Sequence, residues 1–254
     1  MDKTITYFYV NPDDVGKESL TITGEEAKHI LSVCRHKTGD VIFVVDGKGK
    51  KYEVEILSVE KNKVEGRILS STENENEPDV IVCLAQSIGK GTKMDLVIEK
   101  GTEIGVSCFI PLLTQRTNVK IGSEEKERVK IERWKRKALS SMKQCLRSRL
   151  PEVKKATSFD ELLSHVKDYD LVLFGSLEPA CPSGGAKRVK DLADLKKPLK
   201  KILLIVGPEA GFTSDELEKL SDSGAVPVNL GKRRLRTETA GIVFSAVVLG
   251  EVEG

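Results

Sequence analysis

Two loops near the C-terminus carry residue types that could bind a ligand. The first, Gly207-Pro-Glu-Ala-Gly211, follows the uninterrupted aliphatic run Ile202–Val206. Glycine lets the backbone turn sharply and lets a ligand approach main-chain N–H and C=O groups. The second loop, Gly231–Arg236, follows the run Val226–Leu230 and is strongly basic. The two loops therefore predict a ligand site built largely from main-chain groups, with cations beside it.

The runs before these loops are too short for helices and are typical of parallel strands buried on both faces. Thr213 and Glu216 predict a capping box that starts a helix, and the small-residue segment Ala240–Leu249 predicts another. Open α/β sheets bind ligands at the carboxyl ends of adjacent strands, so both loops are expected at one sheet edge. The plainer interpretation is that any α/β protein has such loops. The nucleotide motifs G-x-G-x-x-G and G-x-x-x-x-G-K-[ST] are absent.

The strand and helix patterns predict two domains, 1–73 and 74–254. Residues 1–73 form short, partly alternating strands, interrupted by a helix at Gly24–Arg35, which predicts a small β-barrel. In residues 74–254 strands alternate with helices, which predicts a parallel α/β sheet. The polar, proline-ended segment Thr72–Pro78 is the expected linker.

Composition indicates a soluble globular protein, since 39% of the 254 residues are hydrophobic and 31% are charged. No apolar run approaches the roughly eighteen residues of a membrane span, and the N-terminus does not resemble a signal peptide, so we expect a cytoplasmic protein. The five cysteines never occur as C-x-x-C. We expect them to be reduced and expect no metal site.

A long helix predicted from Ser123 to about Arg149 carries many more Lys and Arg than Glu. Together with the basic loop Lys232–Arg236, this excess is typical of a protein that contacts a phosphate backbone. Charge runs on helices are also commonly just solvated faces.

The paired motifs also carry a family resemblance. Gly-Pro-Glu-x-Gly-Phe after a buried strand, followed by Leu-Gly-x-x-x-Leu-Arg-Thr-Glu-Thr-Ala before a C-terminal helix, resembles the RsmE family of 16S ribosomal RNA uridine N3-methyltransferases, of the SPOUT class of knotted methyltransferases. The resemblance extends through Ala85–Gln86, Lys90–Asp95 and Glu99–Gly105, and through Glu26–His29 and Val33–Arg35 in the first domain. The chain differs from the family pattern at Lys143, Cys145, Leu146 and Ala210, and around Thr6–Tyr7.

The resemblance implies a PUA-like, RNA-binding β-barrel for residues 1–73 and a SPOUT α/β domain with a C-terminal trefoil knot for residues 74–254. It implies S-adenosylmethionine as cofactor, which brings an activated methyl group and requires no metal. The implied cofactor-binding residues are Leu173, Phe174, Gly175, Val206, Gly207, Pro208, Glu209, Gly211, Leu230, Gly231, Leu235, Arg236, Thr237, Thr239 and Ala240.

The implied acceptor is N3 of a uridine, which is neutral near pH 7 and must lose its proton. Our hypothesis is that Arg236 stabilises the developing negative charge, while Glu209 or Glu238 orients the uracil or relays the proton. The alternative is that Arg236 and Glu238 form an ordinary ion pair that fixes the loop. The residues expected to contact RNA are His29, Arg35, Lys93, Arg116, Arg133, Arg147, Arg149, Arg233 and Arg234. His29 could equally be structural, and Lys93 simply solvated.

The implied partners are 16S rRNA or the assembled small ribosomal subunit, and a second copy of the chain in a homodimer. Gly241, Ser245, Ala246 and Gly250 are compatible with close packing of the last helix against its twin, and also with an internal core face. Two alternatives remain from sequence: a ribose 2′-O-methyltransferase of the same class, and a non-catalytic RNA-binding or assembly factor.

Overall fold

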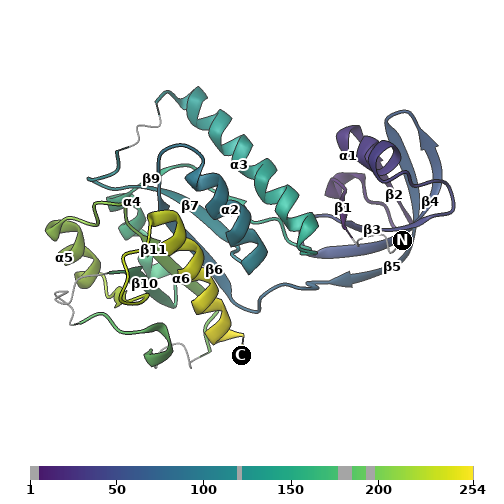
Figure 1. Cartoon of the computed structure of the whole chain (residues 1–254). Coiled ribbons are helices and arrows are strands. Elements are labelled where there is room, and N and C mark those ends of the chain that lie inside the picture. Colours follow the sequence, from purple (N-terminus) through teal and green to yellow (C-terminus); the bar gives the residue numbers. More distant parts are fainter. Residues whose placement is uncertain (1–5, 119–121, 177–184, 193–197, 254) are drawn as a thin grey trace. The chain divides into compact units, whose positions relative to one another are not determined.

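The computed structural model describes residues 6–118, 122–176, 185–192 and 198–253 (Figure 1). Cys181 lies outside these residues, as do Pro182–Gly184 of the sequence Pro-Ser-Gly-Gly at 182–185, whose composition predicts a loop. The chain forms two compact units. One comprises the chain up to Glu77 together with Leu139–Leu150, and the other comprises Pro78–Ala138 and the chain from Pro151 onward. None of the described helices combines the length and the apolar character that a membrane span requires.

The N-terminal unit is built on a five-stranded sheet with the order β1-β3-β4-β5-β2. Its strands are β1 (Phe8–Tyr9), β2 (Ser19–Thr23), β3 (Val41–Val45), β4 (Lys50–Glu60) and β5 (Lys63–Glu73). One face buries alternate side chains, such as Val54 and Ile56 of β4, as expected for a sheet with one solvated side. Strand β5 continues to Glu73, so it includes the first residues of the expected linker.

The helix expected at Gly24–Arg35 is shorter than predicted. It consists of α1 (Gly24–Lys28) and a π-helical turn at His29–Val33. A short 3-10 helix at Pro12–Asp14 precedes it. Arg35 then adopts a left-handed backbone conformation with φ of 56°, which no helix can continue.

The C-terminal unit contains a second sheet with the order β12-β10-β11-β6-β7-β8, and β9 also pairs with β7. All of its recorded strand pairs are parallel. The strands are β6 (Ile81–Ser87), β7 (Cys108–Leu113), β8 (Glu152–Val153), β9 (Thr157–Ser158), β10 (Leu171–Gly175), β11 (Lys201–Val206) and β12 (Val226–Val228). The two-residue strands β8 and β9 are too short to leave a hydrophobic pattern, and the sequence did not predict them.

Helices lie between and after these strands in the chain. They are α2 (Lys93–Ile104), α3 (Glu124–Gln144), α4 (Phe159–Ser164), α5 (Ser214–Asp222) and α6 (Thr237–Val252), with 3-10 turns at Val166–Asp168 and Val189–Asp191. Helix α6 packs on β6 and β11. Helices α2 and α6 lie side by side (Figure 1). Phe159 of α4 and Leu217 of α5 share a buried cluster with sheet residues such as Leu203 and Ile205. The parallel α/β sheet predicted from the sequence is therefore present.

Helix α3 ends earlier than predicted, at Gln144 instead of about Arg149. Leu146 has a φ of 63°, in the left-handed region, where a helix terminates. The segment after it belongs to the N-terminal unit, and Arg147 and Ser148 are buried there.

Candidate active site

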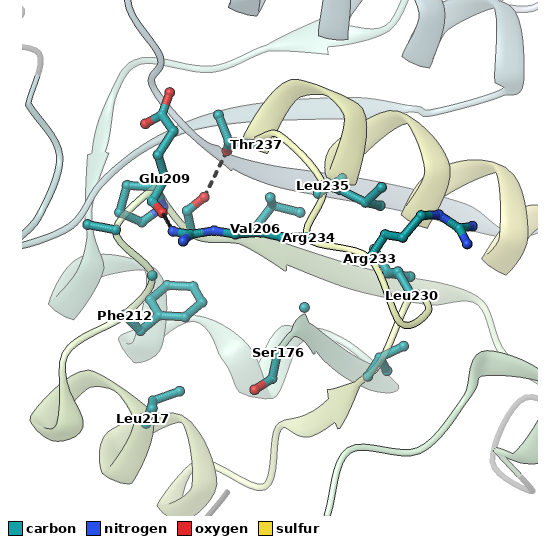
Figure 2. A pocket seen from close by; sticks show the side chains of 17 residues that line it. Ser176, Val206, Glu209, Phe212, Leu217, Leu230, Arg233, Arg234, Leu235 and Thr237 are labelled. Carbon is teal, nitrogen blue, oxygen red and sulfur yellow. Dashed lines mark hydrogen bonds between the residues drawn. The ribbon is translucent and has the colours of Figure 1, made fainter. Parts of the chain in front are cut away.

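A cavity of about 330 Å³ lies where β10, β11 and β12 end and α6 begins (Figure 2). The sheet order explains its place, because β10 pairs with both β11 and β12 and all three run parallel. Loops that are far apart in the sequence therefore gather at one sheet edge. The cavity is lined by Gly175, Ser176, Val206, Gly207, Pro208, Glu209, Ala210, Gly211, Phe212, Leu217, Val228, Leu230, Arg233, Arg234, Leu235, Thr237 and Ala240.

Most of the residues expected to bind a cofactor line this cavity. Those that do not are Leu173, Phe174, Gly231, Arg236 and Thr239. Leu173 and Phe174 lie inside β10 and are fully buried in the core, so only their neighbour Gly175 reaches the cavity. The lining residues that were not predicted are Ser176, Ala210, Phe212, Leu217 and Val228, while Arg233 and Arg234 had been expected at RNA. Phe212 stands inside the recognised motif and could have been found from it.

The loop after β11 is shaped by its two glycines in different ways. Gly211 has a φ of 71°, which favours glycine. At Gly207 the constraint is space, because a Cβ would lie 3.0 Å from the ring of Phe212. Ala210 is not among the residues with positive φ, so it replaces the family's glycine without backbone strain.

The capping box predicted at Thr213 is present at the start of α5. Thr213 Oγ1 accepts from the N–H of Glu216 at 3.2 Å, and Glu216 Oε2 accepts from the N–H of Thr213 at 2.8 Å. Glu216 is fully buried, and its other carboxylate oxygen accepts from the N–H of Gln115 at 2.8 Å. The box therefore also ties the loop to the segment after β7.

Two arginines expected to contact RNA donate hydrogen bonds to the carbonyl groups of this loop. Arg116 Nη1 donates to the carbonyl oxygens of Ala210 at 2.9 Å and Phe212 at 3.0 Å. Arg234 donates to the carbonyl oxygen of Glu209, and Figure 2 shows its side chain extending from one loop to the other. Arg234 thus connects the two predicted loops beside the cavity.

Thr237, the first residue of α6, connects the helix to the end of β11. It is 5% exposed, and its hydroxyl donates to the carbonyl oxygen of Gly207 at 2.8 Å, as drawn in Figure 2. The same hydroxyl accepts from Gln86 Nε2 at 2.9 Å. Gln86 is the last but one residue of β6. It stands in a segment that carries the family resemblance, but it was not predicted as part of the site.

Lys93 links the two glutamates of the catalytic hypothesis. Its Nζ lies 2.5 Å from Glu209 Oε1 and 3.4 Å from Glu238 Oε2. The hydrogen bond with Lys93 holds the pKa of Glu209 below its ordinary value, and the same bond raises the pKa of Lys93. The carboxylate of Glu209 points away from the cavity in Figure 2, so this residue lines the cavity with its main chain.

Arg236 does not pair with Glu238, so the alternative of an ion pair between them is wrong in this structure. Glu238 is 8% exposed and faces Lys93, whereas Arg236 is exposed and is the N-cap residue of α6. Within the described residues, Arg236 has no recorded salt bridge or side-chain hydrogen bond. Its charge is therefore available to a ligand.

The other residues expected at RNA have varied environments. Arg133 donates to Asp95 at 2.8 Å, and Asp95 also accepts from Trp134. Arg149 is exposed and donates to Asn74 at 2.9 Å. Arg147 is buried, 3% exposed, and cannot serve as a surface cation. Burial with an acidic partner explains why its charge is not displayed.

His29 and Arg35 lie in the N-terminal unit, in and just after the π-helical turn. The ring of His29 packs edge-on against Phe8 with centroids 5.6 Å apart, and it contacts the thiol of Cys34. These contacts hold the ring of His29 in place, and its expected contact with RNA stays a prediction. Arg35 is exposed.

The chain matches two family models. Residues 75–249 match an RNA methyltransferase domain, and residues 22–69 match an RNA methyltransferase PUA domain. The ribosomal RNA small subunit methyltransferase E of Bacillus subtilis is 32% identical to this chain, over 92% of this chain and 91% of its own length. This protein belongs to the ribosomal RNA small subunit methyltransferase E family. The resemblance read from the two loop motifs is thereby confirmed.

Solved structures of similar proteins agree with this membership of the methyltransferase E family. A Legionella pneumophila protein described as a methyltransferase, in complex with the cofactor S-adenosylmethionine, is 32% identical with a TM-score of 0.84. A ribosomal RNA small subunit methyltransferase E from Neisseria gonorrhoeae, bound to S-adenosylmethionine, is 28% identical with a TM-score of 0.84. Each comparison covers 97% of both chains.

Proposed function

We propose that this member of the methyltransferase E family uses S-adenosylmethionine to methylate N3 of one uridine in 16S ribosomal RNA. The observation that carries the proposal is the cavity at the carboxyl ends of β10, β11 and β12, which the two family motifs line from opposite sides. Relatives of the same fold are described with S-adenosylmethionine bound.

The residues around the cavity fit this cofactor. Its volume of about 330 Å³ falls in the range of small-molecule sites. Apolar side chains such as Val206, Leu217 and Leu230 suit an adenine ring, while main-chain groups at Gly175 and Gly207 suit polar atoms of the ribose and the amino-acid tail. A Cβ at Gly207 would push Phe212, so glycine keeps the cavity open. When bound, S-adenosylmethionine supplies a methyl group activated by its sulfonium.

The cationic loop before α6 provides the charge that the acceptor requires. Arg236 stands at the N-cap of α6, where the helix dipole also favours negative charge. We assign to Arg236 the stabilisation of the uracil as its N3 proton leaves. This role is consistent with an exposed guanidinium that no carboxylate neutralises within the described residues.

Of the two glutamates, Glu238 is the better candidate to orient the uracil or relay the proton. Glu209 is held by Lys93 at 2.5 Å, and its carboxylate points away from the cavity (Figure 2). Glu238 Oε2 lies farther from Lys93 Nζ, at 3.4 Å, so it is held less tightly than Glu209 Oε1. Lys93 then acts as the cation that faces both carboxylates.

A homodimer is part of the proposal, and the exposed face of α6 supports it. Gly241 and Ser245 are buried within the chain, so they form the internal core face. Ala246, Val247 and Gly250 are exposed, and Val247 is 40% exposed although the helix is apolar on all sides. Helices of this composition are normally buried, so a second copy is the expected cover.

The proposal has three further parts. They are the trefoil knot, 16S rRNA or the small subunit as substrate, and a PUA-like RNA-binding role for the N-terminal unit. The placement of β10 between β11 and β12 supports the knot, since the chain must pass from β11 across β10 to reach β12. The exposed cations Arg35, Arg149 and Arg233 are the side chains we assign to the phosphate backbone.

Two measurements test the proposal. Nucleosides from the 16S rRNA of cells with and without the gene are compared by mass spectrometry, and we expect N3-methyluridine only when the gene is present. Titration calorimetry with S-adenosylmethionine should give heat. Methylation of a ribose 2′-oxygen would support a ribose methyltransferase of the same knotted class, and the absence of heat would support a binding-only factor.

A further inference from the structure

Gln86 is a buried polar residue that contacts the cavity wall without lining the cavity. It lies on β6, 1% exposed, and its Nε2 is 2.9 Å from Thr237 Oγ1 and 3.3 Å from the carbonyl oxygen of Thr237. These partners are 151 positions apart in the sequence. The contact therefore exists only because α6 packs against β6.

The direction of these hydrogen bonds follows from the chemistry of the groups. The hydroxyl of Thr237 has one proton, which it donates to the carbonyl oxygen of Gly207 at 2.8 Å. Gln86 must then be the donor to that hydroxyl. Gln86 therefore donates to the hydroxyl of Thr237, which in turn donates to the carbonyl oxygen of Gly207 directly after β11. In this way the amide of Gln86 orients Thr237, and Thr237 holds the end of β11.

The other half of the Gln86 amide is left unsatisfied. Its Oε1 is buried and has no hydrogen-bond partner among the described residues. Room for this oxygen comes from a missing side chain, because a Cβ on Gly241 would lie 2.0 Å from Oε1. A buried acceptor without a partner lowers stability, so stability does not account for glutamine at this position.

We propose that Gln86 is a positioning residue for methyl transfer, which fixes the Thr237 hydroxyl on the Gly207 carbonyl and so sets the spacing between the two cofactor-binding loops. The inference rests on the proposed function, since it takes the cavity as the S-adenosylmethionine site. Arg236 and Glu238 flank Thr237 in the chain. Gln86 thereby also places the first turn of α6, with both of these residues, relative to β11.

The test is the Gln86→Met variant, because methionine has a similar length but neither donates to Thr237 nor leaves a buried oxygen unpaired. We expect thermal stability to be unchanged or higher. The Kd for S-adenosylmethionine should rise about tenfold, because the two loops that bind it would no longer be held at the same spacing, and a displacement of about 1 Å is enough to impair a site. A residue with only a structural role would give the reverse, lower stability with unchanged affinity.

A matched control and a double variant sharpen the test. Thr102 on α2 is fully buried, and its hydroxyl donates to the carbonyl oxygen of Ile98 at 2.7 Å. Thr102→Val should leave the Kd unchanged. Gln86→Met combined with Thr237→Val should weaken binding no more than the stronger single variant, because both remove the same link. Additive losses would overturn the inference.

If Gln86→Met does not fold, the Gly241→Ala variant tests the same hydrogen bond between Gln86 and Thr237 by a different substitution. Its Cβ would force the Gln86 side chain to move, so the Kd should again rise severalfold. Wild-type affinity in either folded variant contradicts the positioning role while leaving the proposed function intact. If the wild-type protein itself gives no heat with S-adenosylmethionine, the proposed function fails, and this inference fails with it.

Discussion

Arg147 Nη2 lies 2.7 Å from Glu77 Oε2, and both side chains are 4% exposed. The same carboxylate group accepts from the backbone N–H groups of Ser148 at 2.8 Å and Arg149 at 2.7 Å. The sequence placed Arg147 among the RNA-binding cations of a long helix. It is instead a buried residue, and its ion pair with Glu77 connects the segment after α3 to the segment after β5 in the N-terminal unit.

Replacing Arg147 should therefore reduce stability more than RNA affinity. Arg147→Met leaves the Glu77 carboxylate buried without its cation, and we expect a loss of about 3–5 kcal/mol in the free energy of unfolding. Denaturant unfolding measures it. Arg149→Met is the matched control, because the Arg149 side chain is exposed and its removal should change stability by about 0.5 kcal/mol or less. Equal stability of the two variants would contradict the internal role of Arg147.

Lys93→Met should make stability less dependent on pH in the acid range. The pKa of Glu209 is lowered from 4.5 by its hydrogen bond with Lys93, so the wild-type pair contributes stability above pH 4.5 and loses it as pH falls through the lowered pKa. Both side chains are partly exposed, so the contribution should be about 1 kcal/mol or less. Thermal unfolding of both proteins at pH 7 and pH 3 tests this. The two proteins should converge at the lower pH, and a constant difference would refute the pairing.

Lys93→Met should also reduce methyl transfer, because Glu238 would lose its only cation among the described residues. Lys100→Met is the control. Lys100 lies on the same helix and pairs with Glu103 at 2.9 Å, outside the cavity lining. We expect normal turnover for Lys100→Met, so an equal loss in both variants would point to a general effect on α2.

Arg236→Ala and Glu238→Gln test the catalytic hypothesis directly. Loss of charge stabilisation or proton relay typically costs about a hundredfold or more in kcat. Arg236 is exposed, so its removal should not affect folding. Lys232→Ala, in the same exposed loop, is the control and should keep near-normal kcat. Near-normal turnover in folded Arg236→Ala or Glu238→Gln protein removes that residue from the chemistry.

Gly207→Ala and Gly211→Ala should affect different properties. The added Cβ at Gly207 would lie 3.0 Å from the ring of Phe212, so Phe212 must shift against the cavity and cofactor affinity should fall about tenfold. Gly211 has open space but a φ of 71°, so alanine there should cost about 1 kcal/mol of stability. Calorimetry and unfolding measured on both variants separate these effects, and identical behaviour would argue against the geometry of the loop.

Val247→Glu should shift the proposed homodimer toward monomer. A charge on the exposed face of α6 would have to be desolvated in a helix-to-helix contact. Sedimentation over a range of concentrations measures the change. Val129→Glu is the control, because Val129 is 60% exposed on α3 and lies outside the proposed contact. A wild-type protein that remains monomeric at all concentrations would exclude the dimer.

The sequence determined the local features of the site. The aliphatic runs of β11 and β12, the glycines that end them and the capping box at Thr213 each depend on residues within a few positions of one another. Such short-range patterns are set by backbone conformation and hydrogen bonding. The structure has β11 and the capping box where they were predicted, whereas β12 ends at Val228 instead of Leu230. They were sufficient to identify the family and most of the cavity lining.

Only the tertiary structure decided which side chains meet. Three contacts join residues between 70 and 151 positions apart: the link from Gln86 to Thr237, the position of Lys93 beside Glu238, and the burial of Arg147 with Glu77. A lysine or arginine has the same appearance in a sequence whether it is solvated or paired. Its role depends on sheet order and on where a helix ends, and these follow from the packing of the whole unit.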